Sequence, residues 1–221
     1  MKNIIFIAPP AAGKGTQAKL VSEKYNIPHI STGDLLREEA AKSTDLGIKI
    51  KNIMESGALV NDEIITELLK NRLVKNDCDN GYILDGYPRN LEQAKLYEEL
   101  LGSINKDLGV VIFLDIDKEL AMKRTLSRII CSNCGTSYNL IVRELKPKKE
   151  NICDKCEFNL NVRADDNEET FINRFDTYIE KTQSLIDYYK NKNVLEVVRV
   201  LDGLSAEDIF KQIEEIINNN D

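Results

Sequence analysis

Short apolar runs alternate with longer segments of helical periodicity along most of the chain. Apolar runs at residues 3–7, 82–84 and 110–114 have the length and residue types of buried strands. The run at 110–114 is apolar throughout and rich in β-branched residues, which is typical of a strand buried on both faces. The predicted helices cover residues 17–21, 35–40, 48–54, 64–73, 91–101, 168–188 and 206–217, and a last predicted strand covers residues 194–201. Strands that alternate with helices are joined by helical crossovers, so this pattern predicts an α/β fold with a parallel sheet flanked by helices.

The alternation stops between about residues 131 and 166, where turn residues cluster around two Cys-x-x-Cys pairs. Eighteen residues separate the two pairs, which are Cys131 with Cys134 and Cys153 with Cys156. A tetrahedral metal takes two thiolates from each tight turn, so this spacing predicts a four-thiolate zinc site. Two disulfides, a redox-active pair and a zinc ribbon that binds nucleic acid are the alternatives. Neither pair opens a helix after a strand, and the loop between them is mixed in charge and poor in aromatic residues, which disfavours the last two.

The stretch Ala-Pro-Pro-Ala-Ala-Gly-Lys-Gly-Thr at residues 8–16 joins the first predicted strand to the first predicted helix. Strand, tight loop, lysine, hydroxyl and helix in this order are typical of a phosphate-binding loop. In such a loop, backbone N–H groups and the positive end of a helix dipole face one anion. Lys14 is expected to reach the terminal phosphates, and Thr16 to lie near a magnesium ion. The alternative is an ordinary strand–turn–helix with an exposed lysine.

The loop departs from the usual phosphate-binding pattern in two places. Ala8 stands at the opening position, where glycine is usual, and Gly15 stands between the lysine and the hydroxyl. Glycine is usually placed where φ is positive or where the backbone approaches a ligand closely. We therefore expect both Ala8 and Ala11 to have negative φ, with Pro9 and Pro10 stiffening the turn.

Further charged side chains lie just beyond predicted strand ends and around the insertion. Asp85 and Arg89 follow the second predicted strand, and ligands of parallel sheets gather at such strand ends. The arginines around the insertion are Arg124, Arg128, Arg163 and Arg174. Arg124 and Arg128 are four residues apart and are expected on one helix face. A guanidinium fork matches a phosphate bidentately, although a solvated surface charge is the alternative for any single arginine.

Length, charge and composition narrow the class of protein. The 221 residues can bury one sizeable core with room for an inserted subdomain. A net charge of −7 gives no general electrostatic footprint for nucleic acid or an anionic membrane surface. No apolar run approaches the length of a membrane span, and no secretory signal pattern opens the chain, so we expect a cytoplasmic protein with reduced cysteines. The single histidine, His29, is interpreted as solvated or packed rather than catalytic, and Cys78, in a polar stretch, receives no role.

Four segments together resemble the adenylate kinase family, and they occur in the family's order over nearly the full chain. Residues 8–16 resemble its Gly-x-Pro-Gly-x-Gly-Lys-Gly-Thr loop, and residues 31–37 its Ser-Thr-Gly-Asp-x-x-Arg segment. Residues 85–93 resemble its Asp-Gly-Phe-Pro-Arg…Gln segment, and residues 163–174 its Arg-x-Asp-Asp-Asn…Arg segment. The four-cysteine insertion is similar to the zinc-bearing lid of many bacterial members. Lys-Gly-Thr belongs to the family's loop, which accounts for Gly15.

The resemblance implies a P-loop nucleoside-monophosphate kinase fold with a core and two mobile lobes. The core would comprise residues 1–30, 61–123 and 167–221, the AMP-binding lobe residues 31–60, and the zinc-bearing lid residues 124–166. The implied activity is reversible phosphoryl transfer from MgATP to AMP, giving two ADP, by in-line transfer under a closing lid. Arginine and lysine side chains would neutralise the transferring group. A structural Zn²⁺, a Mg²⁺ carried with ATP and a monomeric state without nucleic-acid or membrane partners are also implied.

Site residues carry over from the family by position. Those implied for AMP are Thr32, Arg37, Ala58, Leu59, Val60, Gly86, Arg89, Gln93, Arg163 and Arg174. Those implied for ATP are Ala11, Ala12, Gly13, Lys14, Gly15, Thr16, Arg124, Arg128, Ser137, Tyr138 and Ser205. The catalytic charges would come from Lys14, Arg89, Arg124, Arg163 and Arg174. Zinc would be held by Cys131, Cys134, Cys153 and Cys156, and magnesium would be surrounded by Thr16 and Asp85.

Some departures from the family and some rival functions accompany this interpretation. Ala8 and Ala11 replace glycines, Ser127-Arg128-Ile129 stands in place of a common Gly-Arg-Arg, and Tyr87 replaces the usual Phe. A kinase acting on UMP, CMP or GMP is the nearest rival, and Thr32 with Gln93 favours adenine by resemblance. A nucleotide-dependent switch or a zinc-ribbon nucleic-acid binder is the rival from another class, which the net charge and the arginine set disfavour.

Overall fold

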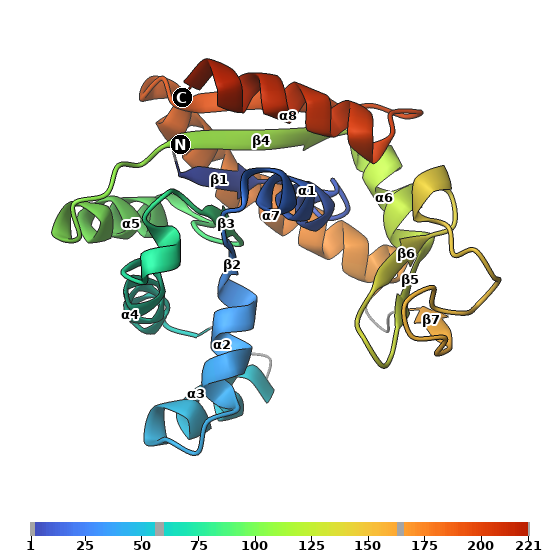
Figure 1. The fold of residues 1–221 in the computed structure, drawn as a ribbon, viewed down its shortest axis with the longest axis horizontal. Coiled ribbons are helices and arrows are strands. Elements are labelled where there is room, and N and C mark those ends of the chain that lie inside the picture. The colour runs from blue at the N-terminus through green and yellow to red at the C-terminus, as the bar shows by residue number, and fades with distance from the viewer. Residues whose placement is uncertain (1–2, 56–59, 163–165, 221) are drawn as a thin grey trace.

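The computed structural model describes residues 3–55, 60–162 and 166–220, and its centre is a five-stranded parallel sheet (Figure 1). The strand order is β2-β3-β1-β4-β8. The strands are β1 (Ile4–Ile7), β2 (His29–Ser31), β3 (Ile83–Asp85), β4 (Val110–Ile116) and β8 (Leu195–Val200). The predicted parallel sheet is confirmed, and each predicted strand agrees with the observed one to within two residues. Residues 27–31, which were not predicted as a strand, contain the edge strand β2.

The described residues contain eight α-helices. They are α1 (Lys14–Tyr25), α2 (Thr32–Ala40), α3 (Asp45–Glu55), α4 (Asp62–Leu73), α5 (Leu91–Ser103), α6 (Lys118–Leu126), α7 (Glu168–Asn191) and α8 (Ala206–Asn220). The seven predicted helices are all present, several of them extended by polar first turns. Asn61, for example, caps α4 by accepting a hydrogen bond from Glu63 N–H. Of the described residues, no helix is both long and apolar enough to cross a membrane.

The apolar strands are buried on both faces of the sheet. In β1, Ile4 and Phe6 join a cluster beneath α1 and α8, whereas Ile5 and Ile7 join a second cluster with residues of α4 and α5. The long helix α7 contributes to both clusters. Alternate residues of a strand point to opposite faces, so a continuous apolar run is what a sheet covered on both sides requires.

Two groups of elements project from this core in different directions (Figure 1). The first consists of α2 and α3. The second is a separate antiparallel sheet of order β6-β5-β7, formed by β5 (Arg128–Cys131), β6 (Ser137–Asn139) and β7 (Leu160–Val162). Short 3₁₀ turns lie at η1 (Asn76–Cys78) and η2 (Arg143–Leu145). The interruption of strand–helix alternation in the sequence therefore corresponds to a small sheet with its own core.

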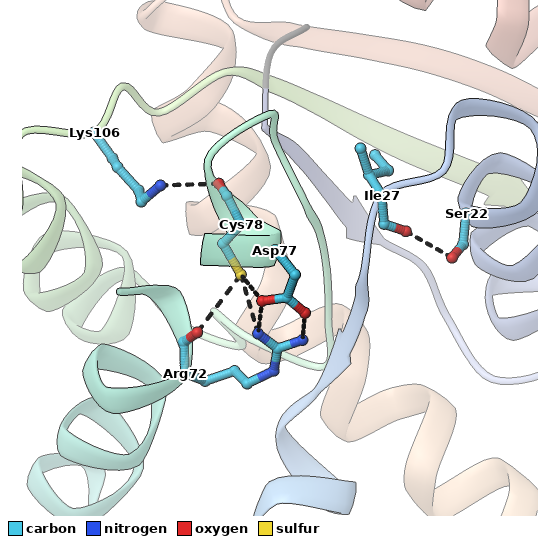
Figure 2. Close-up of polar contacts among 6 residues, drawn as sticks. All are labelled: Ser22, Ile27, Arg72, Asp77, Cys78 and Lys106. Carbon is cyan, nitrogen blue, oxygen red and sulfur yellow. Dashed lines mark hydrogen bonds and ion pairs between the residues drawn. The ribbon is translucent and has the colours of Figure 1, made fainter. Parts of the chain in front are cut away.

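Cys78, to which the sequence assigned no role, is fully buried in the second cluster (Figure 2). Arg72 grips Asp77 through two parallel hydrogen bonds of 2.8 and 2.7 Å, and its Nη1 lies 3.1 Å from Cys78 Sγ. Lys106 Nζ donates to the Cys78 carbonyl at 2.9 Å. Burial raises the pKa of the Cys78 thiol, which keeps it neutral. Arg72, Asp77 and Lys106 thus stabilise the turn that contains this buried, neutral thiol.

Candidate active site

The carboxyl ends of β1 and β3 meet at the same edge of the sheet, and their following loops form the site. In the parallel register, Phe6 of β1 lies beside Asp85 of β3, which lies beside Ser31 of β2. Residues 8–16, the phosphate-loop segment, therefore follow β1 next to Asp85 and next to the start of α2. This is the position at which ligands of open α/β sheets bind.

The phosphate-loop segment leads directly into the predicted first helix, α1. Gly13 is the N-cap of α1, with φ of +89°, and Lys14 is the first helical residue. No side chain of the described residues caps this end of α1, so its first N–H groups are not bonded to a capping side chain. A Cβ built on Gly13 or Gly15 would meet none of the described atoms within 4 Å. The loop therefore presents backbone donors and a helix dipole to open space, as an anion site requires.

The predicted backbone of this loop is right at Ala8 and wrong at Ala11. Ala11 has φ of +61°, whereas Ala8 is not in the positive-φ region. Pro10 precedes Ala11, and Ala12 N–H bonds to the Pro9 carbonyl at 3.4 Å. A turn with proline at its second position and positive φ at its third is the type II arrangement. The Pro9-to-Ala12 turn thus places an alanine in a left-handed conformation that glycine would adopt more readily.

Lys14, Asp85 and His29 form a chain of polar contacts across three elements. Lys14 Nζ lies 2.7 Å from Asp85 Oδ1, and His29 Nε2 lies 3.1 Å from Asp85 Oδ2. The Asp85 side chain is only 15% exposed. Burial by itself would raise the pKa of Asp85, but the His29 hydrogen bond and the Lys14 charge outweigh it and lower that pKa to about 2. Asp85 is therefore an ionised carboxylate beside Lys14 at the start of α1.

Four of the residues predicted for AMP are connected by hydrogen bonds between α2, the loop after β3 and α5. Thr32 Oγ1 donates to the Gly86 carbonyl at 3.1 Å, and Arg89 Nε donates to the same carbonyl at 2.8 Å. Arg89 N–H also donates to Gln93 Oε1 at 2.7 Å. Gly86 has φ of +81°, and a Cβ there would lie 3.1 Å from Thr32 Oγ1, so both backbone and space favour glycine. The structure thus brings these predicted residues to one place.

The remaining residues predicted for AMP are dispersed or fall outside the described residues. Arg37 lies on α2 and its Nη2 contacts Asp34 Oδ1 at 2.5 Å, while Val60 is buried before α4. Arg174 is exposed on α7. The predictions for Ala58, Leu59 and Arg163 lie outside the described residues.

The two arginines at the entrance of the small sheet do not share a helix face, so that prediction is wrong. Helix α6 ends at Leu126, and Arg128 is the first residue of β5. The β-branched pair Ile129-Ile130 favours a strand directly after the helix. Arg128 instead grips Asp166 bidentately, with Nε 2.7 Å from Oδ2 and Nη2 contacting Oδ1. Burial lowers the pKa of Arg124 on α6, an effect countered by the charge of Asp202.

Three further residues predicted for ATP are described by their local contacts. Ser137 is exposed in β6, paired with Ile130 of β5. Tyr138 turns its side chain into the small core, where its hydroxyl lies 3.4 Å from Cys153 Sγ and accepts from Asp154 N–H at 2.7 Å. Ser205 precedes α8 and exchanges hydrogen bonds with Asp208. Any nucleotide contact by Tyr138 would therefore come from its backbone.

The four predicted cysteine ligands converge beside Cys131, the last residue of β5. All four Sγ atoms lie within 4.8 Å of one another. Cys131 Sγ is 3.4 Å from Cys156 Sγ, and Cys134 Sγ is 3.5 Å from Cys153 Sγ. These distances are far longer than a disulfide bond of about 2.05 Å and close to the edge of about 3.8 Å expected for four sulfurs around a tetrahedral Zn²⁺. Cys134 N–H and Lys155 N–H point at the Cys131 and Cys153 sulfurs, as they do around bound thiolates.

Sequence reasoning missed three residues of this site. His29 was interpreted as solvated or packed, Asp166 was only part of a motif, and Asp62, which accepts from Gln93 Nε2 at 2.7 Å, was not predicted for the site. Each contacts a predicted site residue that is 31 or more residues away in the sequence. Local patterns carry no signal for such contacts.

Comparison with known proteins identifies the family. The family model described as adenylate kinase matches residues 6–194. Curated relatives named adenylate kinase include one from Archaeoglobus fulgidus, 49% identical over 97% of this chain and 97% of that protein. Another, from Clostridium tetani, is 44% identical over 97% of this chain and 98% of its own length, and one from Thermotoga maritima is 44% identical over 100% and 99%. With a parallel sheet flanked by helices and a family match over most of its length, the chain belongs to the adenylate kinase family of P-loop nucleoside-monophosphate kinases.

Proposed function

We propose that this enzyme transfers a phosphoryl group in line from MgATP to AMP, reversibly, by positioning and charge neutralisation. The observation that carries the proposal is the placement of Lys14 at the N-terminus of α1, 2.7 Å from Asp85 at the adjacent strand end. Phosphoryl transfer requires little covalent chemistry from the protein and much electrostatic stabilisation. An ammonium group beside open backbone donors supplies that stabilisation for the terminal phosphates of ATP.

Asp85 and Thr16 have the donor chemistry for the surroundings of Mg²⁺. Asp85 is ionised, and carboxylate, hydroxyl and water oxygens are the ligands that Mg²⁺ takes. When bound, the ion would neutralise charge on the ATP phosphates. The residues of the protein hold this arrangement, with Asp85 anchored on one side to β2 and on the other to Lys14.

The AMP site that we propose lies around Thr32, Gly86, Arg89 and Gln93. The Thr32 hydroxyl donates its hydrogen to the Gly86 carbonyl, so the hydroxyl oxygen can only accept a hydrogen bond from a ligand. An acceptor there suits the amino group of adenine and disfavours the carbonyl oxygen of guanine. Arg89 would hold the AMP phosphate, together with Arg37, Val60 and Arg174 and with Ala58, Leu59 and Arg163 outside the described residues.

The two projecting groups of elements support the proposed division into a core and two lobes. Helices α2 and α3, within residues 31–60, would form the AMP-binding lobe, and the small sheet within residues 124–166 the lid. We propose that lid closure excludes water, because water in an open site would accept the phosphoryl group. Arg124, Arg128, Arg163 and Arg174 would then join Lys14 and Arg89 around the transferring group.

The cysteine cluster would hold a structural Zn²⁺, and the other proposals concern the protein as a whole. Four thiolates leave no open position for a reactive water, so the ion would stabilise the lid rather than take part in the reaction. We also propose that the protein acts as a cytoplasmic monomer without nucleic-acid partners. The net charge of −7 and the four reduced-thiol ligands support this setting.

An ADP-formation assay with MgATP and AMP tests the proposal directly. Lys14→Ala and Arg89→Ala should each lower kcat/KM at least about a hundredfold, because each removes a positive side-chain charge that would stabilise the phosphates during transfer. Lys19→Ala is the matched control, since Lys19 lies on the same helix and its ammonium group pairs with Glu23 on the exposed surface at 3.6 Å. UMP, CMP and GMP as acceptors should turn over more slowly than AMP. Absence of ADP from the unaltered enzyme, or full turnover by Lys14→Ala, would contradict the proposal.

A further inference from the structure

The two carboxylate oxygens of Asp85 have different partners. Oδ1 lies 2.7 Å from Lys14 Nζ, and Oδ2 lies 3.1 Å from His29 Nε2. An ionised carboxylate only accepts hydrogen bonds, so the imidazole must carry its hydrogen on Nε2 and donate it. His29 and Lys14 thus each contact one oxygen of the same largely buried carboxylate.

The strand register explains how His29 reaches Asp85. His29 pairs with Ile83 and Ser31 pairs with Asp85, so His29 and Asp85 are diagonal neighbours on one face of adjacent strands. A side chain at a diagonal position reaches its partner only if it is long, and the imidazole ring spans the gap with two rotatable bonds. The sheet order β2-β3-β1 then places Lys14, which follows β1, on the far side of the same carboxylate.

The contact between His29 and Asp85 limits how Lys14 can bind the same carboxylate. An ammonium group has three N–H donors, and with both carboxylate oxygens within reach it could engage both of them. Because His29 occupies Oδ2, Lys14 takes Oδ1, and its remaining donors are left for a phosphate. Without His29, the carboxylate could rotate toward the lysine and hold it more tightly away from the nucleotide.

We propose that His29 is a positioning residue for phosphoryl transfer, fixing the Asp85 carboxylate so that Lys14 is aimed at the terminal phosphates of MgATP. This inference rests on the proposed function of Lys14. The competing role is purely structural, in which His29 only ties the edge strand β2 to β3. Because β2 leads directly into Thr32 and α2, a structural defect there would first weaken AMP binding, whereas a positioning defect would lower kcat and weaken MgATP binding.

Steady-state kinetics of three variants separate these roles. His29→Ala removes the donor, while His29→Gln restores an amide N–H at a similar distance from the backbone. Ser22→Ala is the matched control, because Ser22 Oγ donates to the Ile27 carbonyl at 2.7 Å in the turn that leads into β2 (Figure 2). It loosens the same turn without touching the carboxylate.

The expected result is a kcat about tenfold lower for His29→Ala, a higher KM for MgATP and a KM for AMP within about twofold of the unaltered enzyme. His29→Gln should recover kcat to within about twofold, and Ser22→Ala should lower thermal stability with unchanged kcat. A kcat unchanged in His29→Ala, a His29→Gln enzyme as impaired as His29→Ala, or a defect confined to the KM for AMP would overturn the inference. An unaltered enzyme that forms no ADP would instead refute the proposed function.

Discussion

Arg128 and Asp166 join the segment that enters the small sheet to the segment that leaves it. Arg128 opens β5, and Asp166 lies just before α7, with its side chain fully buried beneath the guanidinium fork. Two parallel hydrogen bonds connect the pair, 38 residues apart in the sequence. A charged contact with a fully buried carboxylate therefore joins the two segments at the base of the proposed lid.

Removing this carboxylate should weaken the fold. Asp166→Ala removes the buried carboxylate that accepts two hydrogen bonds from the Arg128 guanidinium, and we expect a loss of about 1–3 kcal/mol in the free energy of unfolding, measured by urea titration. Lys118→Ala is the control, because the Lys118–Asp176 pair is exposed and should contribute less than about 1 kcal/mol. Equal losses in the two variants would show that the Arg128–Asp166 contact behaves as a surface pair.

The left-handed conformation of Ala11 predicts a stabilising substitution. Ala11→Gly should relieve about 1–2 kcal/mol of backbone strain, less the entropy that glycine adds to the unfolded chain, for a net gain of up to about 1 kcal/mol. Ala8→Gly is the matched control, since Ala8 lacks positive φ and glycine there should cost about 0.5–1 kcal/mol. Thermal unfolding of both variants would reveal the difference, and an equal effect of the two substitutions would contradict the inference that Ala11 is strained.

The lowered pKa of Asp85 predicts a specific acid sensitivity. A carboxylate whose pKa falls from 3.8 to about 2 on folding stabilises the fold above its unfolded pKa, and this stabilisation is lost as pH falls through the folded pKa. Between about pH 4 and about pH 2 the unaltered protein should therefore lose about 2 kcal/mol more than Asp85→Asn. Urea titrations across this window, without magnesium or nucleotide, measure the two slopes. Equal pH dependence of the unfolding free energy in the two proteins would show that Asp85 is not the source of the acid sensitivity.

Metal removal should affect the proposed lid more than the chemistry. We expect about one zinc per chain in freshly reduced protein, and a lower thermal midpoint after chelation, because the thiolates then lose the ion that joins them. Cys134→Ser should lose zinc, whereas Cys78→Ser should keep it, since Cys78 lies outside the cluster. Protein without bound metal would refute the site, and iron in place of zinc would correct the identity of the metal.

The sequence predicted the features that contiguous residues encode. The apolar run at 110–114, the spacing of the two cysteine pairs and the Gly13-Lys14-Gly15-Thr16 loop ending all appear where they were expected. Periodicity and ligand spacing act within one segment, so they can be read before the chain folds. Ala11 marks the limit of this reasoning, because the preceding proline turn outweighed its preference for negative φ.

Only the tertiary structure decided which distant residues meet. Sheet order β2-β3-β1 places His29, Asp85 and Lys14 in one row, and chain direction at the small sheet turns Arg128 from α6 toward Asp166. Such contacts depend on strand order and register, which side-chain periodicity does not specify. The sequence by itself therefore determined the helices, the strands and the cysteine cluster that could hold a metal, and the order and register of the strands determined which charged side chains meet.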